Sequence, residues 1–225
     1  MRPPLVIAHR GASAQALENS LAAFRRAVDL GADGIELDVH ATLDGALLVH
    51  HDPVIDGAAI SSLTLSDARQ HRLANGERPP TLAEALEAAG PTLTVCIEVK
   101  ALDARYDATL FGQIDAAPAP KHCQVHSFDH RIIRRLSGQR PAVTYGVLST
   151  SYPLDPVEQI TQAGARTLWE EASMIDQPLV TLVHQAGAHV IAWTVDDPAR
   201  ARGLAAMGVD GLCTNTPDLI RKALA

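Results

Sequence analysis

The sequence contains no run of about 18 apolar residues, which excludes a helix long enough to cross a membrane. It also contains no cluster of lysine and arginine, and its formal net charge is −7. Nonspecific binding to nucleic acid depends on such clusters because they neutralise phosphates, so we expect no nucleic-acid partner. Apolar residues make up 47% of the chain and charged residues 20%, as in globular domains. We therefore expect a soluble globular protein without a stable membrane anchor.

Cysteine is scarce, and the three cysteines, Cys96, Cys123 and Cys213, are an odd number without the short spacing of a metal site. Each lies in an apolar stretch, so we expect reduced residues buried in the core. A secretory signal peptide has no place either, because the first strand-like segment already begins at Leu5. Both features predict a cytoplasmic protein. Nothing in the sequence indicates an oligomeric state.

The length suits a single domain, residues 1–225, with a sizeable core. Along it, apolar strand-like segments alternate with segments of helical period. The strand-like segments lie near Leu5–Ala8, Ile35–Val39, Leu93–Val99, Cys123–Ser127, Ala142–Leu148, Thr167–Trp169, His189–Thr194 and Gly211–Thr214. The helical segments lie at Leu21–Leu30, Leu82–Ala89, Ala104–Ile114, His130–Leu136, Val157–Ala163, Leu179–Gln185, Ala199–Met207 and Asp218–Leu224.

The junctions between helix and strand repeat a glycine followed by a small residue and an apolar run, as in GADGIELDV, GAHVIAWTV and GVDGLCTNT. Glycine after a helix supplies the left-handed conformation that ends it, so each repeat is typical of a helix leading into a parallel strand. About eight such units predict a closed (β/α)₈ barrel, with an open doubly wound sheet as the alternative. Residues 53–80 interrupt the pattern after the second strand, with one short helix expected after Thr64. They predict a short insertion or lid.

The segment from Ile35 to Asp52 combines acids and histidines with a strand-like pattern. Residues two apart share a face of a strand, so Glu36, Asp38 and His40 should point one way. Two neighbouring acids suggest a metal site. The Asp44-Gly45 pair is equally typical of a surface hairpin. With the rest of the chain considered, we favour a barrel strand followed by a short extension that carries the chain to His51.

Polar residues stand at nearly every predicted strand end, and in a parallel barrel these ends meet at the face where active sites lie. Together with the neighbouring Trp169, they are His9, Arg10, Glu36, Asp38, His51, Asp52, Glu98, Lys100, His126, Glu170, Trp193 and Asn215. Carboxylate oxygens suit Mg²⁺ or Ca²⁺, so Glu36, Asp38 and Glu98 are candidate metal ligands. A divalent cation is the predicted cofactor.

The histidines and cations at these strand ends suggest phosphoryl chemistry. Imidazole changes protonation near neutral pH, so His9 and His51 are candidates for general acid and base. Arg10 and Lys100 would stabilise a charged phosphoryl group. Each of these residues also has a purely structural alternative. Glu98 and Lys100 could form a buried ion pair. In the same way, His126 is more often structural, and Trp193 could belong to the core.

Several separated motifs together resemble the glycerophosphodiester phosphodiesterase family. In order, they are IAHRG, Glu18-Asn19-Ser20, GADGIELDV, DG with VHHD, IEVK, HSF, AWTV, and GVDG with TNTPD. This resemblance implies a (β/α)₈ barrel that hydrolyses glycerophosphodiesters to glycerol 3-phosphate and an alcohol with Mg²⁺ or Ca²⁺. It implies that Glu36, Asp38 and Glu98 bind the metal and that His9 and His51 are the acid and base. It also implies that Arg10, Lys100, Asn19 and Trp193 bind the small-molecule substrate.

The resemblance further implies attack by the neighbouring glycerol hydroxyl and opening of a cyclic phosphate by water. The chain departs from the family pattern at the insertion, where Pro53 to Ala59 replaces a run with Thr and Arg. Ser20 stands where Thr is usual, Asp196 where Asn is usual, and Asn215 where Asp is usual. The altered insertion leaves open a phosphodiesterase for lysophospholipid or another phosphodiester. A barrel that binds a phosphodiester without turnover is a separate alternative, which no motif favours because both histidines and all three carboxylates are present.

Overall fold

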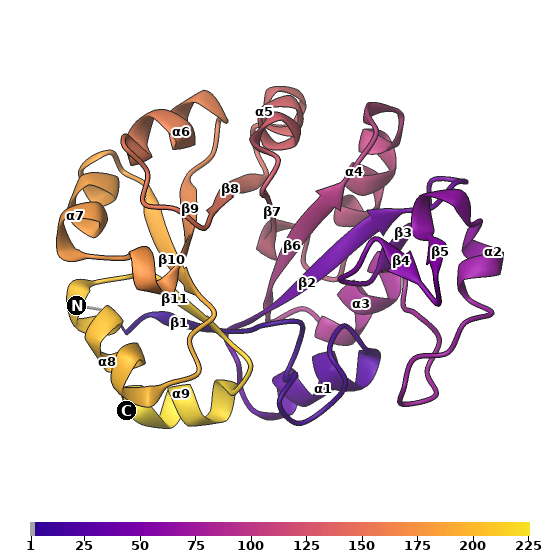
Figure 1. Cartoon of the computed structure of the whole chain (residues 1–225), viewed down its shortest axis with the longest axis horizontal. Helices are drawn as coiled ribbons and strands as arrows, with labels where there is room; N and C mark the ends of the chain where they lie inside the picture. Colours follow the sequence, from indigo (N-terminus) through magenta and orange to yellow (C-terminus); the bar gives the residue numbers. More distant parts are fainter. Residues whose placement is uncertain (1–2) are drawn as a thin grey trace.

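In the computed structural model, which describes residues 3–225, eight parallel strands close into a barrel (Figure 1). They are β1 (Leu5–Ala8), β2 (Gly34–Ala41), β6 (Thr94–Ala101), β7 (Cys123–Ser127), β8 (Thr144–Ser149), β9 (Thr167–Glu171), β10 (His189–Trp193) and β11 (Gly211–Thr214). The neighbours run β1-β11-β10-β9-β8-β7-β6-β2, and pairing of β1 with β2 closes the ring. The predicted (β/α)₈ barrel is confirmed, and the ring closure excludes the open sheet.

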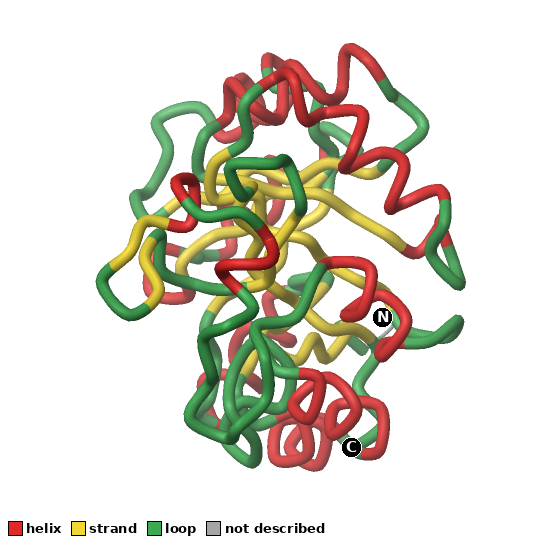
Figure 2. Tube along the Cα trace, turned by 90° about the vertical axis from the view of Figure 1, so that its right-hand side faces the viewer, coloured by secondary structure: helices red, strands yellow, loops and turns green. Residues whose placement is uncertain are grey.

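Helices surround the strands, as Figures 1 and 2 show. They are α1 (Leu21–Asp29), α3 (Leu82–Ala89), α4 (Asp107–Asp115), α5 (His130–Gln139), α6 (Pro156–Gln162), α7 (Gln177–Gln185), α8 (Pro198–Met207) and α9 (Pro217–Leu224). Side-chain caps explain most of their starts, because an oxygen at the N-cap satisfies an otherwise free backbone N–H. Ser20 caps α1 in this way, and Thr81 forms a capping box with Glu84 at the start of α3. Among the described residues, no helix is long and apolar enough to cross a membrane.

Short 3-10 helices join several of these elements, namely η1 (Ile60–Ser62), η2 (Ala104–Tyr106), η3 (Pro120–His122) and η4 (Ala172–Met174). One of them corrects a predicted boundary. The segment Ala104–Ile114, expected to be one helix, is divided into η2 and α4. Asp103 caps η2 by accepting a hydrogen bond from the N–H of Arg105. The short first turn therefore has its own start signal, which the helical period does not reveal.

The core has two layers, as expected for a barrel whose strand residues alternate between two faces. A large cluster lies between the strands and the helices and includes Ile35, Leu37 and Val39 of β2. A smaller cluster consists of Ile7, Cys96, Leu148, Trp169, Ile191 and Cys213. All three cysteines are buried and unpaired, as predicted. Because Ile35, Leu37 and Val39 pack in the outer layer, Glu36 and Asp38 on the opposite face of β2 point towards the barrel interior.

The end of β2 is both a barrel strand and one arm of a hairpin, so the two interpretations of this segment hold together. Its residues Val39 to Ala41 pair antiparallel with β3 (Leu47–Val49). In the connecting turn, Asp44 accepts hydrogen bonds from the Thr42 hydroxyl at 2.6 Å and from the N–H of Leu65 at 3.0 Å. The predicted barrel strand is therefore confirmed, and the extension that leads to His51 is itself the second arm of the hairpin that we had judged less fitting.

The insertion over residues 53–80 has its own small structure beside the hairpin (Figure 1). It contains the two-stranded sheet of β4 (Val54–Ile55) and β5 (Ala58–Ala59), then η1, then α2 (Leu65–Ala68). The predicted helix after Thr64 is α2, with Thr64 and Asp67 as its capping box. A small apolar cluster of Leu48, Ile55, Ile60 and Ala68 joins the insertion to β3. The insertion, which follows His51 in the chain, is thus packed against β3.

Candidate active site

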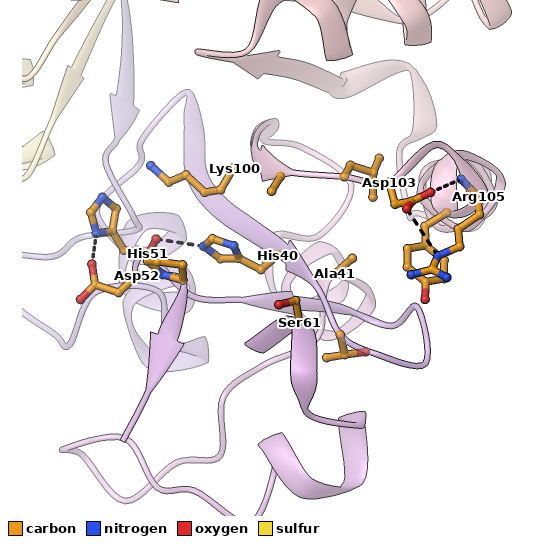
Figure 3. A pocket seen from close by; sticks show the side chains of 13 residues that line it. His40, Ala41, His51, Asp52, Ser61, Lys100, Asp103 and Arg105 are labelled. Carbon is orange, nitrogen blue, oxygen red and sulfur yellow. Dashed lines mark hydrogen bonds and ion pairs between the residues drawn. The ribbon is translucent and has the colours of Figure 1, made fainter. Parts of the chain in front are cut away.

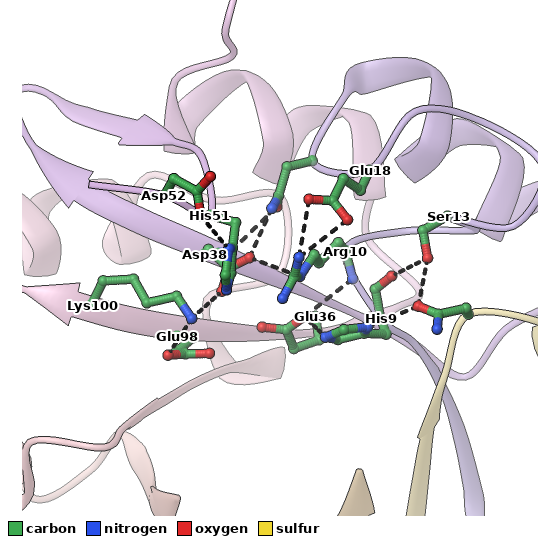
Figure 4. Close-up of polar contacts among 12 residues, drawn as sticks. His9, Arg10, Ser13, Glu18, Glu36, Asp38, His51, Asp52, Glu98 and Lys100 are labelled. Atoms are coloured by element: carbon green, nitrogen blue, oxygen red, sulfur yellow. Dashed lines mark hydrogen bonds and ion pairs between the residues drawn. The ribbon is translucent and has the colours of Figure 1, made fainter. Parts of the chain in front are cut away.

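The carboxyl ends of the barrel strands surround a cavity of about 230 Å³, which we call the inner pocket. Seven of the nine predicted site residues line it: His9, Arg10, Glu36, His51, Glu98, Lys100 and Trp193. His126, Phe128, Leu148, Trp169 and Cys213 complete the wall. Figure 4 shows the acids and cations of this group pointing towards one another. Asp38 and Asn19, the other two predicted residues, lie behind this wall.

Glu36 on β2 is a buried carboxylate at the bottom of the inner pocket. It accepts a hydrogen bond from the N–H of Arg10 at 3.1 Å. Two imidazoles also face it, with Nε2 of His9 at 4.0 Å and Nε2 of His126 at 3.9 Å. Burial, followed by the charges of Asp38 and Glu98, raises the pKa of Glu36 well above its ordinary value. Such a crowded carboxylate favours a positive charge beside it.

Asp38, two residues further along β2, is held from three sides. Its Oδ1 lies 2.9 Å from Nζ of Lys100, and its Oδ2 lies 3.3 Å from Nε of Arg10. Asn19 donates from Nδ2 to Oδ2 at 2.7 Å, and Oδ1 of Asn19 accepts from the N–H of Asp38 at 3.3 Å. Burial alone would raise the pKa of Asp38, but Lys100, Asn19 and Arg10 lower it below its ordinary value.

Asn19 therefore holds a carboxylate instead of facing the inner pocket. It is only 3% exposed, and its backbone φ of 52° turns its side chain inwards. An asparagine tolerates this left-handed conformation better than most residues. The geometry suits a positioning residue for Asp38, which differs from the direct substrate contact that the sequence suggested.

Glu98 and Lys100 on β6 form the ion pair that was one of the alternatives for them. Nζ of Lys100 lies 2.7 Å from Oε1 of Glu98, in addition to its contact with Asp38. Burial raises the pKa of Glu98 to about 7, and Lys100 opposes that shift. One lysine thus bridges two carboxylates at the mouth of the barrel. Both residues of the pair line the inner pocket.

His126 at the end of β7 is a site residue that the sequence argument ranked low. Its ring is 1% exposed and stacks on the indole of Trp169, with ring centroids 4.2 Å apart and planes at 6°. Burial lowers the pKa of His126 to about 3, so the ring is neutral and can offer a lone pair. Its Nδ1 has no hydrogen-bond partner within residues 3–225. The HSF motif marked this position but not its contacts.

Glu36, Glu98 and His126 form a cluster suited to a divalent cation. Each offers a ligand atom, and the three atoms lie within 4.8 Å of one another. Two buried carboxylates with raised pKa values and a neutral imidazole are donors that Mg²⁺, Ca²⁺ or a transition metal accepts. This cluster shares two members with the predicted set and has His126 in the place of Asp38.

His9, directly after β1, is oriented by Asn215, which follows β11, and by Asp196, which follows β10. Its Nδ1 lies 2.8 Å from Oδ1 of Asn215, and Nδ2 of Asn215 donates to Oδ2 of Asp196 at 2.7 Å. A carboxylate only accepts, so the amide of Asn215 must present its oxygen to His9. The ring then carries a proton on Nδ1, and Nε2 is left free beside Glu36. Burial lowers the pKa of His9.

The Asp196–Asn215 contact also explains two departures from the family pattern. The two positions lie 19 residues apart in the sequence, but their side chains are hydrogen-bonded to each other. At these positions the resemblance leads us to expect Asn and Asp in the opposite order, and the donor and acceptor still match across one hydrogen bond. The N–H of Asn215 and the hydroxyl of Thr214 also donate to Asp196, at 2.7 and 2.9 Å.

His51 reaches the site from the short segment between β3 and the insertion. Its Nδ1 lies 2.8 Å from Oδ1 of Asp52, so Nε2 is the ring nitrogen left for the pocket. His40, predicted on the face of Glu36 and Asp38, places its Nε2 3.0 Å from the carbonyl oxygen of His51. This contact anchors the backbone of His51 to β2. His40 is therefore part of the support of the site.

Arg10 and the aromatic residues complete the mouth. The guanidinium of Arg10 contacts Glu18 at 3.0 Å as well as Asp38. On the opposite wall, the ring of Phe128 meets Trp193 edge to face, with centroids 5.5 Å apart and planes at 79°. Phe128 is 46% exposed and was not among the predicted site residues. The inner pocket thus has a cationic side and an aromatic side.

Comparison with known proteins agrees with this geometry. Residues 9–219 match the glycerophosphoryl diester phosphodiesterase family. A glycerophosphodiester phosphodiesterase of Caldanaerobacter subterraneus subsp. tengcongensis is 33% identical, over 97% of this chain and 98% of that protein.

Solved structures resemble the whole chain. A glycerophosphodiester phosphodiesterase from Parabacteroides distasonis has a TM-score of 0.89 and 27% identity, over 99% of this chain and 97% of that one. A phosphodiesterase from Oleispira antarctica, solved with the product sn-glycerol-3-phosphate, has a TM-score of 0.91 and 25% identity, over 98% and 96% of the two chains. Together with the barrel and the residues at its mouth, these matches show that the chain belongs to the glycerophosphoryl diester phosphodiesterase family.

Proposed function

We propose that this protein hydrolyses glycerophosphodiesters to glycerol 3-phosphate and an alcohol, using a divalent cation and two histidines. The observation that carries the proposal is one pocket in which His9 and His51 accompany buried carboxylates and the cations of Arg10 and Lys100. These groups together suit a phosphodiester, whose oxygens are negative and whose cleavage needs an acid and a base. Family membership and the product held by the Oleispira antarctica relative support the same substrate class.

The partners of the two histidines distinguish their roles. His9 is bonded to the neutral amide of Asn215, which leaves a lone pair on Nε2 for a base. His51 is bonded through Nδ1 to the carboxylate of Asp52, which orients Nε2 towards the pocket to give a proton to the leaving oxygen. In the first step, the glycerol 2-hydroxyl attacks phosphorus and its proton passes to Nε2 of His9. The bond from phosphorus to the alcohol oxygen breaks as His51 gives that oxygen a proton.

Water then opens the cyclic phosphate with the proton transfers reversed. His51, now neutral, takes a proton from water, and His9 returns its proton to the 2-oxygen of glycerol. The net reaction consumes one water for each diester and leaves both histidines as they began. Arg10 and Lys100 would bind phosphoryl oxygens, and Trp193 would line the side of the pocket that receives glycerol, since all three residues line the inner pocket.

The proposed cation would be held by Glu36 and Glu98, with His126 or Asp38 as a further ligand. When bound, such a cation supplies Lewis-acid stabilisation of charge on the phosphoryl oxygens. The oxygen-rich donor set suits Mg²⁺ or Ca²⁺. Asn19 would keep Asp38 in place for either role, because its amide bonds Asp38 through both of its polar atoms.

The test is release of glycerol 3-phosphate from glycerophosphocholine and glycerophosphoethanolamine in the presence of Mg²⁺, Ca²⁺ or Mn²⁺. We expect His9→Ala and His51→Ala each to reduce kcat by about 100-fold or more, as for loss of a general acid or base. A chelator should abolish activity, and restored cation should recover it. Glu18→Gln, which changes an exposed partner of Arg10, serves as the control. Binding of the diester without any turnover would support the non-catalytic alternative instead.

A further inference from the structure

A second cavity of about 590 Å³, which we call the outer pocket, is shown in Figure 3. It adjoins the inner pocket. The two cavities share His51 and Lys100 in their walls. A diester whose phosphate lies beside these two residues therefore has space on both sides. The inner pocket, at about 230 Å³, is the smaller of the two. Nothing in the proposed reaction so far uses the outer pocket.

The outer pocket is formed mainly by the segment that follows β3 and by the segment at the end of β6. Asp52, directly before the insertion, and Ser61 within it contribute one side, and Ala101, the last residue of β6, and Tyr106 of η2 contribute the other. The wall at Tyr106 is braced by the hairpin, because its hydroxyl donates to the carbonyl oxygen of Leu43 at 2.7 Å.

Gly45 in the hairpin turn makes this bracing possible. A Cβ at this position would lie 2.4 Å from Cε1 of Tyr106, so a larger residue would push the hairpin from the wall. Its φ of 82° also favours glycine. The turn and the ring are therefore fitted to each other.

The charges of the outer pocket favour some ligands over others. Lys100 is already paired with two carboxylates of the inner site. Arg105 is paired with Asp103, whose carboxylate accepts from its N–H at 3.0 Å and lies 3.7 Å from its Nε. Both wall cations thus have acidic partners, and the carboxylate of Asp52 is itself bonded to Nδ1 of His51. Neither Lys100 nor Arg105 is left without a carboxylate partner for an anionic ligand, whereas an uncharged or cationic ligand needs no such cation.

We propose that the outer pocket binds the alcohol portion of the diester and favours uncharged or cationic alcohols over anionic ones. This inference rests on the proposed function and adds to it the site of the leaving group. Glycerol and phosphate occupy the inner pocket, and the alcohol extends past His51 into the outer pocket. His51 then lies beside the bond that breaks, where it gives its proton to the leaving oxygen.

The steric test narrows the outer pocket from both sides. Ser61→Trp and Ala101→Phe each add bulk to one wall, and both positions are exposed, so the fold should tolerate the change. Ser66→Trp is the matched control, because Ser66 is an exposed serine of the same insertion outside the outer pocket. For each protein, kcat/KM is measured on two glycerophosphodiesters, one releasing methanol and one releasing inositol.

We expect the inositol-to-methanol ratio of kcat/KM to fall about tenfold or more in Ser61→Trp and Ala101→Phe, and to stay unchanged in Ser66→Trp. A ratio that stays the same in both pocket variants would overturn the inference while the proposed function stands. Failure of the unaltered protein to hydrolyse either of these diesters, or those of choline and ethanolamine, would overturn the proposed function and the inference with it.

The charge test uses two alcohols of similar size. The unaltered protein should hydrolyse the diester of ethanolamine with a kcat/KM at least about tenfold above that of the diester of glycolate. Asp103→Asn should reduce this preference, because it removes one of the two wall carboxylates. Equal rates on the two diesters would contradict the charge preference, and a faster reaction of the glycolate diester would reverse it.

Discussion

At the scale of single residues, the most specific feature is the series of hydrogen bonds from Asp196 through Asn215 to His9. It sets which ring nitrogen of His9 carries the proton. In Asp196→Asn, the new amide can donate to Asn215, whose own amide then turns its NH₂ towards His9. The neutral ring would move its proton to Nε2, and the base would lose the lone pair that faces the pocket.

We therefore expect Asp196→Asn to lower kcat about 100-fold, as for loss of a general base. The exchange of both residues, Asp196→Asn with Asn215→Asp, should recover most of the rate, because a carboxylate at 215 again accepts from Nδ1 of His9. A double-mutant cycle of kcat measures this recovery. If the double exchange is as slow as the single one, the residues do not act through the His9 tautomer.

Asp210 offers a second prediction at this scale, away from the active site. It accepts from the N–H of Val190 at 2.8 Å and lies 2.9 Å from Nε2 of His184 and 3.2 Å from Nδ1 of His189. Burial would raise the pKa of Asp210, but these hydrogen bonds lower it below its ordinary value. A lowered folded-state pKa means that the stabilisation is present above the unfolded-state pKa of about 3.9 and declines below it.

Asp210→Asn should thus lower the free energy of unfolding by about 1 kcal/mol at pH 7, a modest figure because Asp210 is partly exposed. The difference between the two proteins should persist at pH 5 and shrink below about pH 3.9, as Asp210 takes up a proton. Urea unfolding at pH 7, 5 and 3.5 measures it. A difference that does not shrink below about pH 3.9 would contradict this account.

At the scale of elements, β8 must leave space for the indole that supports His126. A Cβ on Gly146 would lie 2.7 Å from Cδ1 and 2.9 Å from Nε1 of Trp169. Gly146→Ala should therefore displace the indole from its stack and cost about 1–3 kcal/mol of unfolding free energy, as other overpacked core substitutions do. It should also lower activity, because His126 loses its support.

Gly203→Ala in α8 is the matched control. No heavy atom lies within 4 Å of a Cβ at this position. Alanine in a helix should there be neutral or stabilising by up to about 1 kcal/mol. Thermal unfolding and near-ultraviolet circular dichroism of both variants compare the two. Equal stability of the two alanine variants would show that the barrel interior relaxes around Trp169.

Prediction of the elements succeeded where a local signal exists. The glycine junctions located the strands, and β7 and β11 have the predicted bounds. Helix boundaries were less exact, since the first residues of α6, α8 and α9 are prolines that a helical period does not count. The antiparallel pairing of β2 with β3 was one of two alternatives and was judged the less fitting, because a strand that serves both a barrel and a hairpin has no distinct periodicity.

At the scale of the whole molecule, a bound cation should stabilise the fold, since the crowded carboxylates of Glu36 and Glu98 gain a counter-charge. At a cation concentration of 100 Kd, the free energy of unfolding should rise by about 2.7 kcal/mol and the Tm by about 5–10 °C. Thermal unfolding with Mg²⁺, Ca²⁺ or chelator measures this without reference to activity.

Variants of single ligands identify the cation site. Glu98→Gln should remove the cation-dependent rise in Tm, and Glu18→Gln should retain it. Comparison of His126→Asn with Asp38→Asn then tells which residue completes the site. Only the variant that has lost a ligand should need a higher cation concentration to reach the same rise in Tm. A rise in Tm that survives Glu98→Gln would place the cation elsewhere.

The sequence by itself determined the barrel, the family and most of the residues at the strand ends, because periodicity, glycine junctions and short motifs are local in the chain. Tertiary structure alone decided how those residues are held. Asn19 supports Asp38 across 19 positions, and Asn215 orients His9 across 206. The stack of His126 on Trp169 and the outer pocket likewise join distant segments. Such contacts depend on which side chains closure of the barrel brings together, and no local pattern records that.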